Sequence, residues 1–555
     1  MGKHGGQSIV EVLKKEGVTK VFGVPGESYL NVLDAIYEEP SIEFISGRQE
    51  GGVSFIAEGY AKATGEVAVC MATRGPGATN LSAGLHTAQQ DSTPMVAMLG
   101  QVERHFMGRE AFQEVDFASY FKDLCKWSVE IDDANRIPEI LHRAFHVARS
   151  GRPGPVVVSL PEDMQDDIVD GRQHELFGPI QAGRPRPEKA LVKEAAEKLS
   201  QAKKPIIIAG GGVNLSKGAT ENLVKVSEAL NIPVATAFRR FHAFPNTHPN
   251  YAGTLGLGAM EGLTEYIQES DLVLALGTKF SQMTTSDYTL LNEKSELIHV
   301  DISSDMLGRA YKPTLPIVAD ANAFLVELLK IIEPVQSEER EKNLQDINDK
   351  YVDFSTPHLT NQEQFADLKT VIHTLREQLP ENAIVTSDAG NFFSWISRYY
   401  RFGPKNLYLG PTSGAMGYGM PAAIGAKVAF PEKVVVSISG DGGFMMTMQE
   451  FETAVRYNVP IIQIIANNNI YGTIRAHQEA KFPERVIATK LSNPNYADLA
   501  TNFGGYGERV SHNDQFADAL QRSIESKKPA IIEIVTNPTI LSAKQEEAMR
   551  QNNEL

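Results

Sequence analysis

The chain has 555 residues, of which 42% are hydrophobic and 22% are charged, and nothing in this balance points away from an ordinary soluble protein of three or four domains. The formal net charge of −16 argues against nucleic acid as a partner, because binding to a phosphate backbone normally needs a basic face. The first residues do not resemble a signal peptide and no apolar run is long enough to span a membrane, so we expect a cytoplasmic protein without membrane association.

Residues 1–165 alternate short β-branched strands with amphipathic helices, a pattern typical of a parallel α/β sheet. The two cysteines of the chain, Cys70 and Cys125, are too few for a disulfide framework and are expected to be buried thiols. The expected strands of this first block are Lys20–Val24, Glu43–Ser46, Ala68–Ala72, Met95–Leu99 and Val156–Leu160.

Two further blocks repeat this style at residues 188–335 and 360–540, and a polar tail at 541–555 is expected to be a helix or a disordered end. The fold class is therefore α/β, with three domains that are each a mostly parallel sheet flanked by helices. The expected strands are Pro205–Ala209, Val234–Thr236, Leu272–Leu276 and Leu297–Val300 in the middle block, and Ile384–Asp388, Val434–Ser439, Ile461–Ala466 and Ala530–Val535 in the third.

Two polar clusters in the third block follow two consecutive strands. The run Gly440–Gly443 ends one strand and the run Asn467–Asn469 ends the next, with a helix expected between them at Met445–Tyr457. Strands joined in this way run parallel, so both clusters lie at the sheet edge where such folds bind ligands. The Asp441 carboxylate, the Asn468 amide oxygen and a backbone carbonyl beyond it suit Mg2+, and the glycines let backbone N–H groups approach an anion. The segment therefore predicts a site for Mg2+ and a diphosphate.

This arrangement resembles the thiamine-diphosphate motif of the decarboxylase and acetolactate synthase group of enzymes, and the resemblance runs from about Gln7 to about Asn537. It implies the thiamine-diphosphate-binding fold with a Rossmann-like middle domain. By resemblance, the Mg2+ ligands are Asp441, the Asn468 side chain and the Ile470 carbonyl. Further residues that the resemblance assigns to the cofactor here are Gly440, Gly442, Gly443, Tyr471 and Gly472.

The family also needs a carboxylate beside the aminopyrimidine ring of the cofactor, and the run GRQEGGVSFIAEGYAKATG resembles the motif that places it at Glu50. Glu58, two turns along the same expected helix, is the alternative. The runs GVPGES and ATRGPGATN also match family segments, which assigns Pro25, Gly26 and Asn80 to the cofactor, although Asn80 could instead be a helix cap.

Two runs of the third block resemble further cofactor-binding segments. TSGAMGYGMPAAIGA resembles the segment that bends the cofactor, with Met416 wedged beneath it and the Gly414 carbonyl accepting from its 4′-amino group. SDAGNFFSW would supply Gly390, Asn391 and Phe392 to the diphosphate, although it departs from the Gln-His pair common in acetolactate synthases.

Candidates for substrate contact are Gln101, Phe112 and Gln113, with Phe112 alternatively a core residue, and catalytic roles are expected for Gln113 and His477. His477 stands near the place where biosynthetic acetolactate synthases have a Trp that favours a larger acceptor, so the acceptor pocket is expected to differ. A histidine there could assist proton transfer or lie on the surface.

Biosynthetic members hold a redox-silent FAD on the middle domain, where this chain has LGTKFSQMTTS in place of a more Arg/Asp-rich turn. Gly210–Gly212 and Gly277 could still line an adenine-nucleotide groove. The presence of FAD is therefore left open.

The resemblance implies a carboligase that decarboxylates a 2-oxo acid such as pyruvate and joins the fragment to a second carbonyl compound. The alternatives are a 2-oxo acid decarboxylase or 2-hydroxy ketone lyase that does not ligate, and a non-catalytic relative that binds a nucleotide. In this family Glu50 and the metal loop of one site come from two chains, so we expect a homodimer or homotetramer. The sequence says nothing of a regulatory subunit.

Overall fold

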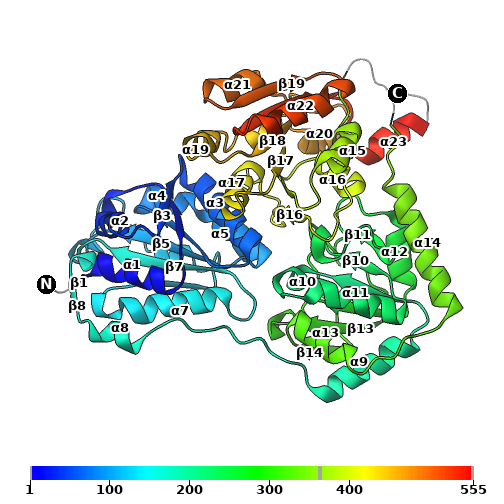
Figure 1. The fold of residues 1–555 in the computed structure, drawn as a ribbon, viewed down its shortest axis with the longest axis horizontal. Coiled ribbons are helices and arrows are strands. Elements are labelled where there is room, and N and C mark those ends of the chain that lie inside the picture. The colour runs from blue at the N-terminus through cyan, green and yellow to red at the C-terminus, as the bar shows by residue number, and fades with distance from the viewer. Residues whose placement is uncertain (1–2, 360–364, 552–555) are drawn as a thin grey trace.

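The computed structural model describes residues 3–359 and 365–551, which form three parallel six-stranded sheets flanked by helices (Figure 1). This confirms the α/β class. The N-terminal, middle and C-terminal domains occupy the left, the lower right and the top of Figure 1. Residues 1–2, 360–364 and 552–555, which open the first and third predicted blocks and close the tail, lie outside the described residues.

The N-terminal sheet is a central apolar layer between two groups of helices. Helices α1 (Gly5–Lys15), α2 (Leu30–Tyr37) and α7 (Ile137–Arg149) pack on one face, and α3 (Glu50–Thr64) and α5 (Ser82–Asp91) pack on the other. Its strand order is β3 (Glu43–Ser46), β2 (Lys20–Gly23), β4 (Ala68–Ala72), β5 (Met95–Gln101), β7 (Pro155–Pro161) and β6 (Trp127–Glu130). A small antiparallel pair joins β1 (Lys3–His4) to β8 (Ile168–Val169).

The middle domain has a hydrophobic core of its own, built between its sheet and its helices. Its strand order is β11 (Tyr251–Thr254), β10 (Val234–Thr236), β9 (Pro205–Ala209), β12 (Leu272–Leu276), β13 (Glu296–Asp301) and β14 (Leu315–Val318). Its helices are α9 (Lys189–Gln201), α10 (Gly211–Leu215), α11 (Ala219–Leu230), α12 (Glu261–Glu269), α13 (Ala321–Leu329) and α14 (Glu338–Phe354).

The C-terminal sheet follows the same plan. Its strand order is β16 (Leu407–Leu409), β15 (Ile384–Ser387), β17 (Val435–Gly440), β18 (Ile462–Asn467), β20 (Ala530–Val535) and β19 (Tyr506–Val510). Its helices are α15 (Leu368–Gln378), α16 (Phe393–Tyr399), α17 (Gly419–Ala429), α18 (Asp441–Phe444), α19 (Glu450–Arg456), α20 (Gly472–Lys481), α21 (Tyr496–Asn502), α22 (Phe516–Glu525) and α23 (Ala543–Gln551). The described part of the tail is thus a helix.

The helix predicted at Met445–Tyr457 is wrong in its first turns. α18 ends at Phe444, before the predicted range begins, residues 445–449 form tight turns, and the short helix α19 covers the rest. The Thr447 hydroxyl donates to the Gly417 carbonyl at 2.7 Å, which ties the intervening segment to a neighbouring loop. A tertiary hydrogen bond therefore overrides the helical pattern.

Both cysteines are buried and free, as predicted. Within residues 3–359 and 365–551, every helix is too short or too polar to cross a membrane.

The N-terminal and C-terminal domains share one hydrophobic core, because α3 and α17 pack with their backbones almost in contact. A Cβ built on Gly425 would lie 2.0 Å from the Ile56 carbonyl oxygen, and one on Gly59 would lie 2.5 Å from the Ala422 Cα. Both distances are well below van der Waals contact. Glycine is therefore required at these two positions for the two helices to approach.

We expect Gly425→Val to lower the free energy of unfolding by about 3 kcal/mol, because the added side chain must push the two helices apart. Chemical denaturation followed by circular dichroism measures this. Gly171→Ala is the matched control, since a Cβ there meets open space, and a change of about 0.5 kcal/mol or less is expected. Equal effects of the two substitutions would contradict the proposed role of the helix contact.

Candidate active site

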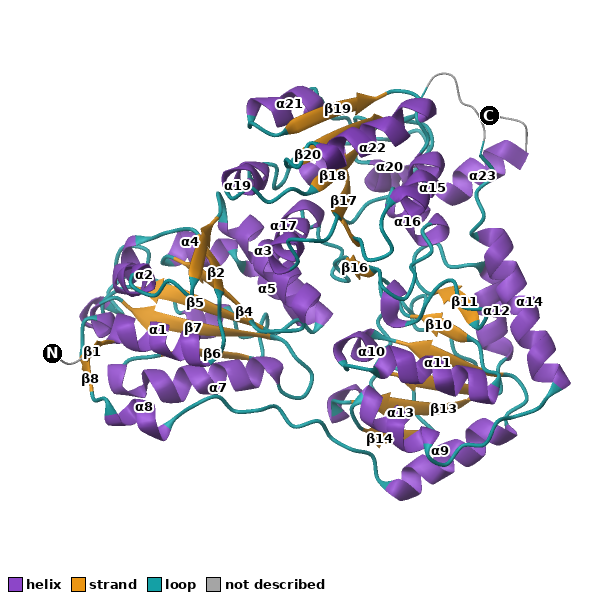
Figure 2. Ribbon diagram, in the orientation of Figure 1, coloured by secondary structure: helices purple, strands orange, loops and turns teal. Residues whose placement is uncertain are grey.

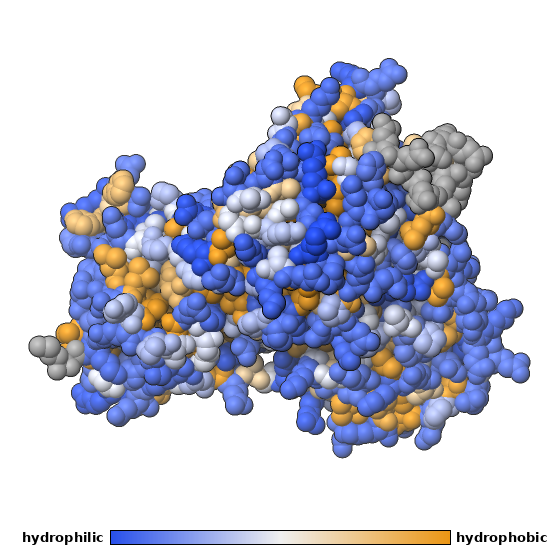
Figure 3. Space-filling model, turned by 45° about the horizontal axis from the view of Figure 1, so that its top comes forward, coloured by the Kyte–Doolittle hydropathy of each residue, from blue (hydrophilic) through white to orange (hydrophobic). Residues whose placement is uncertain are grey.

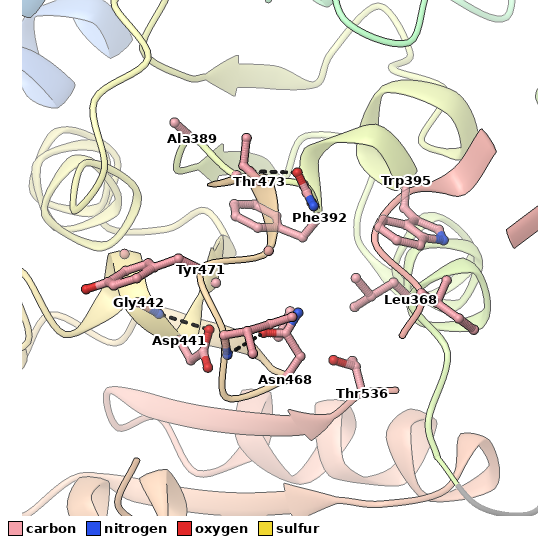
Figure 4. Close-up of a pocket in the computed structure, with 18 of the residues that line it drawn as sticks. Leu368, Ala389, Phe392, Trp395, Asp441, Gly442, Asn468, Tyr471, Thr473 and Thr536 are labelled. Carbon is pink, nitrogen blue, oxygen red and sulfur yellow. Dashed lines mark hydrogen bonds between the residues drawn. The ribbon is translucent and has the colours of Figure 1, made fainter. Parts of the chain in front are cut away.

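The two polar clusters that follow β17 and β18 lie side by side. Gly440 pairs with Ala466 in the parallel register of these strands, so Asp441 and Asn468 leave the sheet at the same edge. Figure 4 shows both side chains close together beside a cavity at this edge. The juxtaposition expected from the strand order is therefore present.

Asp441 is a buried carboxylate held by two hydrogen bonds. It accepts from the Gly442 N–H at 2.9 Å and from Asn493 Nδ2 at 2.7 Å. Burial raises the pKa of Asp441, although these donors oppose the rise. A cation beside such a carboxylate would favour its charged form.

Asn493 is a member of this site that no sequence motif indicates. Its amide also donates to Asn467 Oδ1 at 3.0 Å, so it connects Asp441 to the loop after β18. It lies in an irregular polar segment well beyond that strand, where neither spacing nor periodicity marks it.

A cavity of about 290 Å3 opens at this sheet edge. Four separate segments of the C-terminal domain meet around it, and together they contain every residue that the resemblance assigns to the diphosphate, metal and cofactor-bending parts of the site. These residues are Gly390, Asn391, Phe392, Gly414, Met416, Gly440, Asp441, Gly442, Gly443, Asn468, Ile470, Tyr471 and Gly472.

The cavity lining contains a buried hydrogen-bond donor that is available to an anionic acceptor. Asn391 Oδ1 accepts from the Thr473 hydroxyl at 2.6 Å, but its buried Nδ2 finds no acceptor within the part of the chain that the structure describes. A buried donor without a partner is costly unless a ligand or water supplies the acceptor. Gly414, with φ at 73°, leaves the cavity wall beside it uncovered, since no atom lies within 4 Å of a built Cβ.

The far wall of the cavity comes from residues to which the resemblance assigns no role. Leu368 of α15 and Trp395 of α16 face the Asp441 side across the cavity (Figure 4), and α23 contributes Glu546. Glu546 accepts from Trp395 Nε1 at 2.6 Å and pairs with Lys369 Nζ at 3.2 Å. The helical tail is thus part of the cavity wall.

The N-terminal residues predicted for the site form a second cluster elsewhere. Glu50 begins α3, and one of its carboxylate oxygens accepts from Asn80 Nδ2 at 3.0 Å. The other oxygen lies 3.0 Å from a Cβ built on Gly77, and one built on Gly26 lies 2.4 Å from the Thr73 Cβ. Small residues therefore surround the carboxylate, where larger side chains would cover it.

Gln113 lies beside this cluster. Its carbonyl accepts from the Gly75 N–H at 2.9 Å, and its backbone has a left-handed φ of 66°. Phe112 is 78% exposed, so its alternative placement in the core is wrong. The buried Gln101 uses its amide on the Val115 carbonyl at 2.8 Å, within its own domain.

The cavity lining contains none of the predicted residues of the N-terminal domain. Figure 2 shows α4 (Gly75–Asn80) to the left of the α3–α17 pair, and α16 and α20 to the right of it. Pro25 is exposed, and so is His477, which lies on α20 one turn beyond Ile474 of the cavity wall. Within one chain the predicted site residues therefore form two separate clusters, which we call half-sites.

The alternative carboxylate, Glu58, does not belong to either half-site. It is fully buried, pairs with Lys62 at 2.8 Å and accepts from the Tyr418 hydroxyl at 2.6 Å. This closed network keeps Glu58 away from any ligand.

A groove between the middle domain and the N-terminal domain, called the middle groove below, is lined by Gly211, Gly212 and Gly277, three of the glycines noted in the sequence. Gly210 and Gly212 donate to the carbonyls of Leu276 and Gly277 at 2.9 Å, so these two N–H groups hold the turn after β9 against the end of β12. Burial lowers the pKa of the Lys279 ammonium in this groove to about 8. The basic side chains that line it are Arg152, Arg184, Arg240 and Lys279.

Three family models match the chain, each described as a domain of a thiamine pyrophosphate enzyme, which is a synonym for a thiamine diphosphate enzyme. The N-terminal TPP binding domain matches residues 3–120, the central domain 192–328 and the C-terminal TPP binding domain 388–534. These matches coincide with the two half-sites and the middle groove. The chain therefore belongs to the thiamine-diphosphate enzyme family and is an enzyme of this kind.

Curated relatives are similar over nearly the whole chain. The probable acetolactate synthase large subunit of Methanocaldococcus jannaschii is 33% identical over 96% of this chain and 92% of its own length. The acetolactate synthase isozyme 2 large subunit of Escherichia coli is 34% identical, over 96% and 95%. The chloroplastic acetolactate synthase 1 of Nicotiana tabacum is 32% identical, over 96% and 82%.

We expect Glu546→Ala to destabilise the protein by about 3 kcal/mol, because it leaves the Lys369 ammonium and the Trp395 N–H buried without a partner. Denaturation measures the loss. In a Trp127→Phe background Trp395 is the remaining tryptophan, and its fluorescence should shift to longer wavelength as α23 loosens. Lys544 lies on the same helix as Glu546, and Lys544→Ala removes only its exposed ion pair with Glu261 of α12, so it should change neither signal. An unshifted spectrum of the Glu546 variant would contradict the docking of α23.

Proposed function

We propose that the protein is a carboligase that uses thiamine diphosphate to decarboxylate a 2-oxo acid such as pyruvate and to join the fragment to a second carbonyl compound. The observation that carries this proposal is the cavity after β17 and β18, whose lining contains every residue that the resemblance assigns to the diphosphate end. The names of the relatives, which are acetolactate synthases similar along 96% of this chain, support the same reaction class.

The cavity fits the diphosphate end of the cofactor. The unpaired Asn391 Nδ2 can donate to a phosphate oxygen, and Gly414 leaves room beside it. When bound, thiamine diphosphate supplies a carbanion centre that adds to the carbonyl of a 2-oxo acid and takes up the electrons left by CO2.

Mg2+ would be held by the Asp441 carboxylate, the Asn468 side chain and the Ile470 carbonyl. Within the described residues, no three His, Cys, Asp or Glu side chains are grouped so that they could hold a metal. A site with one carboxylate leaves much of the octahedron of Mg2+ to phosphate oxygens and water, as is usual for this ion. Metal and cofactor therefore bind together in this proposal.

Glu50 would exchange a proton with the ring nitrogen of the aminopyrimidine. Its hydrogen bond from Asn80 holds one oxygen in place and leaves the other for the ring. The candidates for substrate contact, Gln101, Phe112 and Gln113, lie on the same domain as Glu50. His477 would approach the acceptor substrate from α20.

The middle groove is a candidate site for FAD, which would bind there in addition to thiamine diphosphate at its own site. The basic side chains there suit the diphosphate of a dinucleotide. The enclosed part of the groove measures only about 90 Å3, so such a ligand would extend into the adjoining open groove of about 800 Å3. The absorption spectrum of the purified protein decides between an empty and a flavin-containing groove.

The working unit in this proposal is a homodimer, which can pair further into a tetramer. The two half-sites of one chain lie on opposite sides of the α3–α17 pair (Figure 2), so in this proposal a complete site needs Glu50 from one copy and the cavity from another. Exposed apolar side chains flank both halves, including Phe112 and Tyr120 on one domain and Met446 and Ile474 on the other. Figure 3 shows apolar patches that interrupt the hydrophilic surface over the N-terminal domain, at left.

Incubation with pyruvate, Mg2+ and thiamine diphosphate is expected to release CO2 and to form acetolactate. Acetaldehyde that persists without a ligation product would favour plain decarboxylation, and the absence of both products would refute the use of pyruvate.

Glu50→Gln should lower turnover by about 10²- to 10⁴-fold while cofactor still binds in calorimetry. Glu43→Gln is the control. Glu43 lies on β3, the strand before α3, and its carboxylate pairs with Lys20 of β2, so the substitution should leave turnover unchanged.

Mixing two inactive variants tests the shared site. When Glu50→Gln and Asp441→Ala chains are expressed together, each mixed dimer contains one intact site, so about a quarter of the original activity should return. Asp441→Ala with Asn468→Ala is the control, because both changes damage the same half and every site stays defective. If the site lay within one chain, neither mixture would recover activity.

A further inference from the structure

We propose that Arg239 and Arg240 of the middle domain position the Thr412–Gly419 segment through two buried aspartates, Asp91 and Asp388. This segment carries Gly414 and Met416, so the inference rests on the function proposed above. The arginines themselves would not touch the cofactor. They would act through the aspartates that hold the two ends of the segment.

The end of the segment near Gly419 is held by Asp388, which is fully buried just after β15. Its carboxylate accepts from the Gly417 N–H at 3.1 Å and from the Gly419 N–H. The Gly417 carbonyl in turn accepts from the Thr447 hydroxyl at 2.7 Å. Burial raises the pKa of Asp388 to about 6, although the two backbone donors oppose the rise.

The other end of the segment is held by Asp91 of the N-terminal domain. Its carboxylate accepts from the Thr412 hydroxyl at 2.7 Å and from the Thr412 N–H at 3.2 Å. The next residue, Ser413, shares a hydrogen bond with Thr87 of the same domain at 2.9 Å. Both ends are therefore fixed by buried polar contacts, whereas Gly414 between them meets open space.

Two consecutive arginines bind these two aspartates. Arg239 donates to the Asp388 carbonyl at 2.9 Å and lies over the Phe393 ring, 4.1 Å from its centre. Arg240 pairs with the Asp91 carboxylate at 2.7 Å. One middle-domain turn thus reaches the supports of both ends of the segment.

The backbone of this turn is strained in a way that serves the contact. Arg239 has a φ of 59°, in the left-handed region that non-glycine residues rarely adopt. Such strain persists only where the surroundings over-determine it. Here it lets neighbouring arginines reach different domains, Arg239 the C-terminal and Arg240 the N-terminal.

Charge balance explains why Arg240 matters. Asp91 and Glu58 are both fully buried, and Lys62 pairs with both, at 2.9 Å and 2.8 Å. Without Arg240 this cluster would hold two carboxylates against one ammonium. An uncompensated buried charge destabilises its surroundings, and the contact that can move is the one to the loop residue Thr412.

The first test uses cofactor-free protein and needs no activity. In hydrogen–deuterium exchange with mass spectrometry, Arg240→Gln and Asp388→Asn should speed exchange across residues 412–419 by about tenfold or more, while the rest of the chain keeps its protection. Arg240→Lys should restore part of the protection. Arg401→Gln is the matched control, because Arg401 joins the C-terminal domain to Ser355 beyond α14 and does not contact the segment.

The second test measures the exchange of the C2 proton of bound thiamine diphosphate with deuterium, which requires the cofactor to be correctly bent. Arg240→Gln should slow it by about 10- to 100-fold at saturating cofactor, with Arg240→Lys intermediate. Folded variants with unchanged exchange across 412–419 would overturn the proposal, and so would a loosened segment with an unchanged C2 rate. If the unmodified protein shows no C2 exchange at all, the proposed function fails, while the first test still decides whether the arginines hold the segment.

Discussion

The contact between α3 and α17 is the constraint on which the rest of the molecule depends. Gly59 and Gly425 let the backbones of the two helices meet, and the N-terminal and C-terminal sheets thereby share one core. Each helix also begins at, or next to, residues predicted for the site. Glu50 is the first residue of α3, and α17 starts directly after the segment that carries Gly414 and Met416. A rigid contact in the core therefore sets the places of both half-sites, and it sets them apart.

Buried carboxylates around this contact are stabilised in different ways. Asp91 has two cationic partners and Asp388 is held mainly by backbone N–H groups. Asp441 accepts from backbone N–H groups and from the Asn493 amide, and among the described residues it forms no ion pair. The first two are largely satisfied by the protein itself. Asp441 is left with capacity for a cation at the mouth of a cavity, which is the distinction between a structural carboxylate and one that can bind a metal.

Sequence patterns predicted the central strands well, because buried parallel strands are continuous apolar runs. The motif residues of the C-terminal domain line one cavity, and their roles in binding stay predictions. Edge strands such as β6 and β19 were missed, since they are half-exposed and carry polar residues. Asn493, Trp395 and Glu546 were missed for another reason. They reach the site through tertiary packing of an irregular segment, of α16 and of the tail, and spacing along the chain carries no trace of that.

The shared core also determines how such a chain can be divided between related proteins. The middle domain encloses its own core, and among the described residues Phe238, Phe241 and Met283 reach from it into a core of the C-terminal domain. Recombination that exchanges the whole middle domain but keeps these three residues would keep each core intact. A crossover that replaces the N-terminal domain alone would pair an α3 from one parent with an α17 from another, and backbones that touch tolerate little mismatch. We therefore expect the two outer domains to be exchanged only as one unit, although a third of the chain separates them.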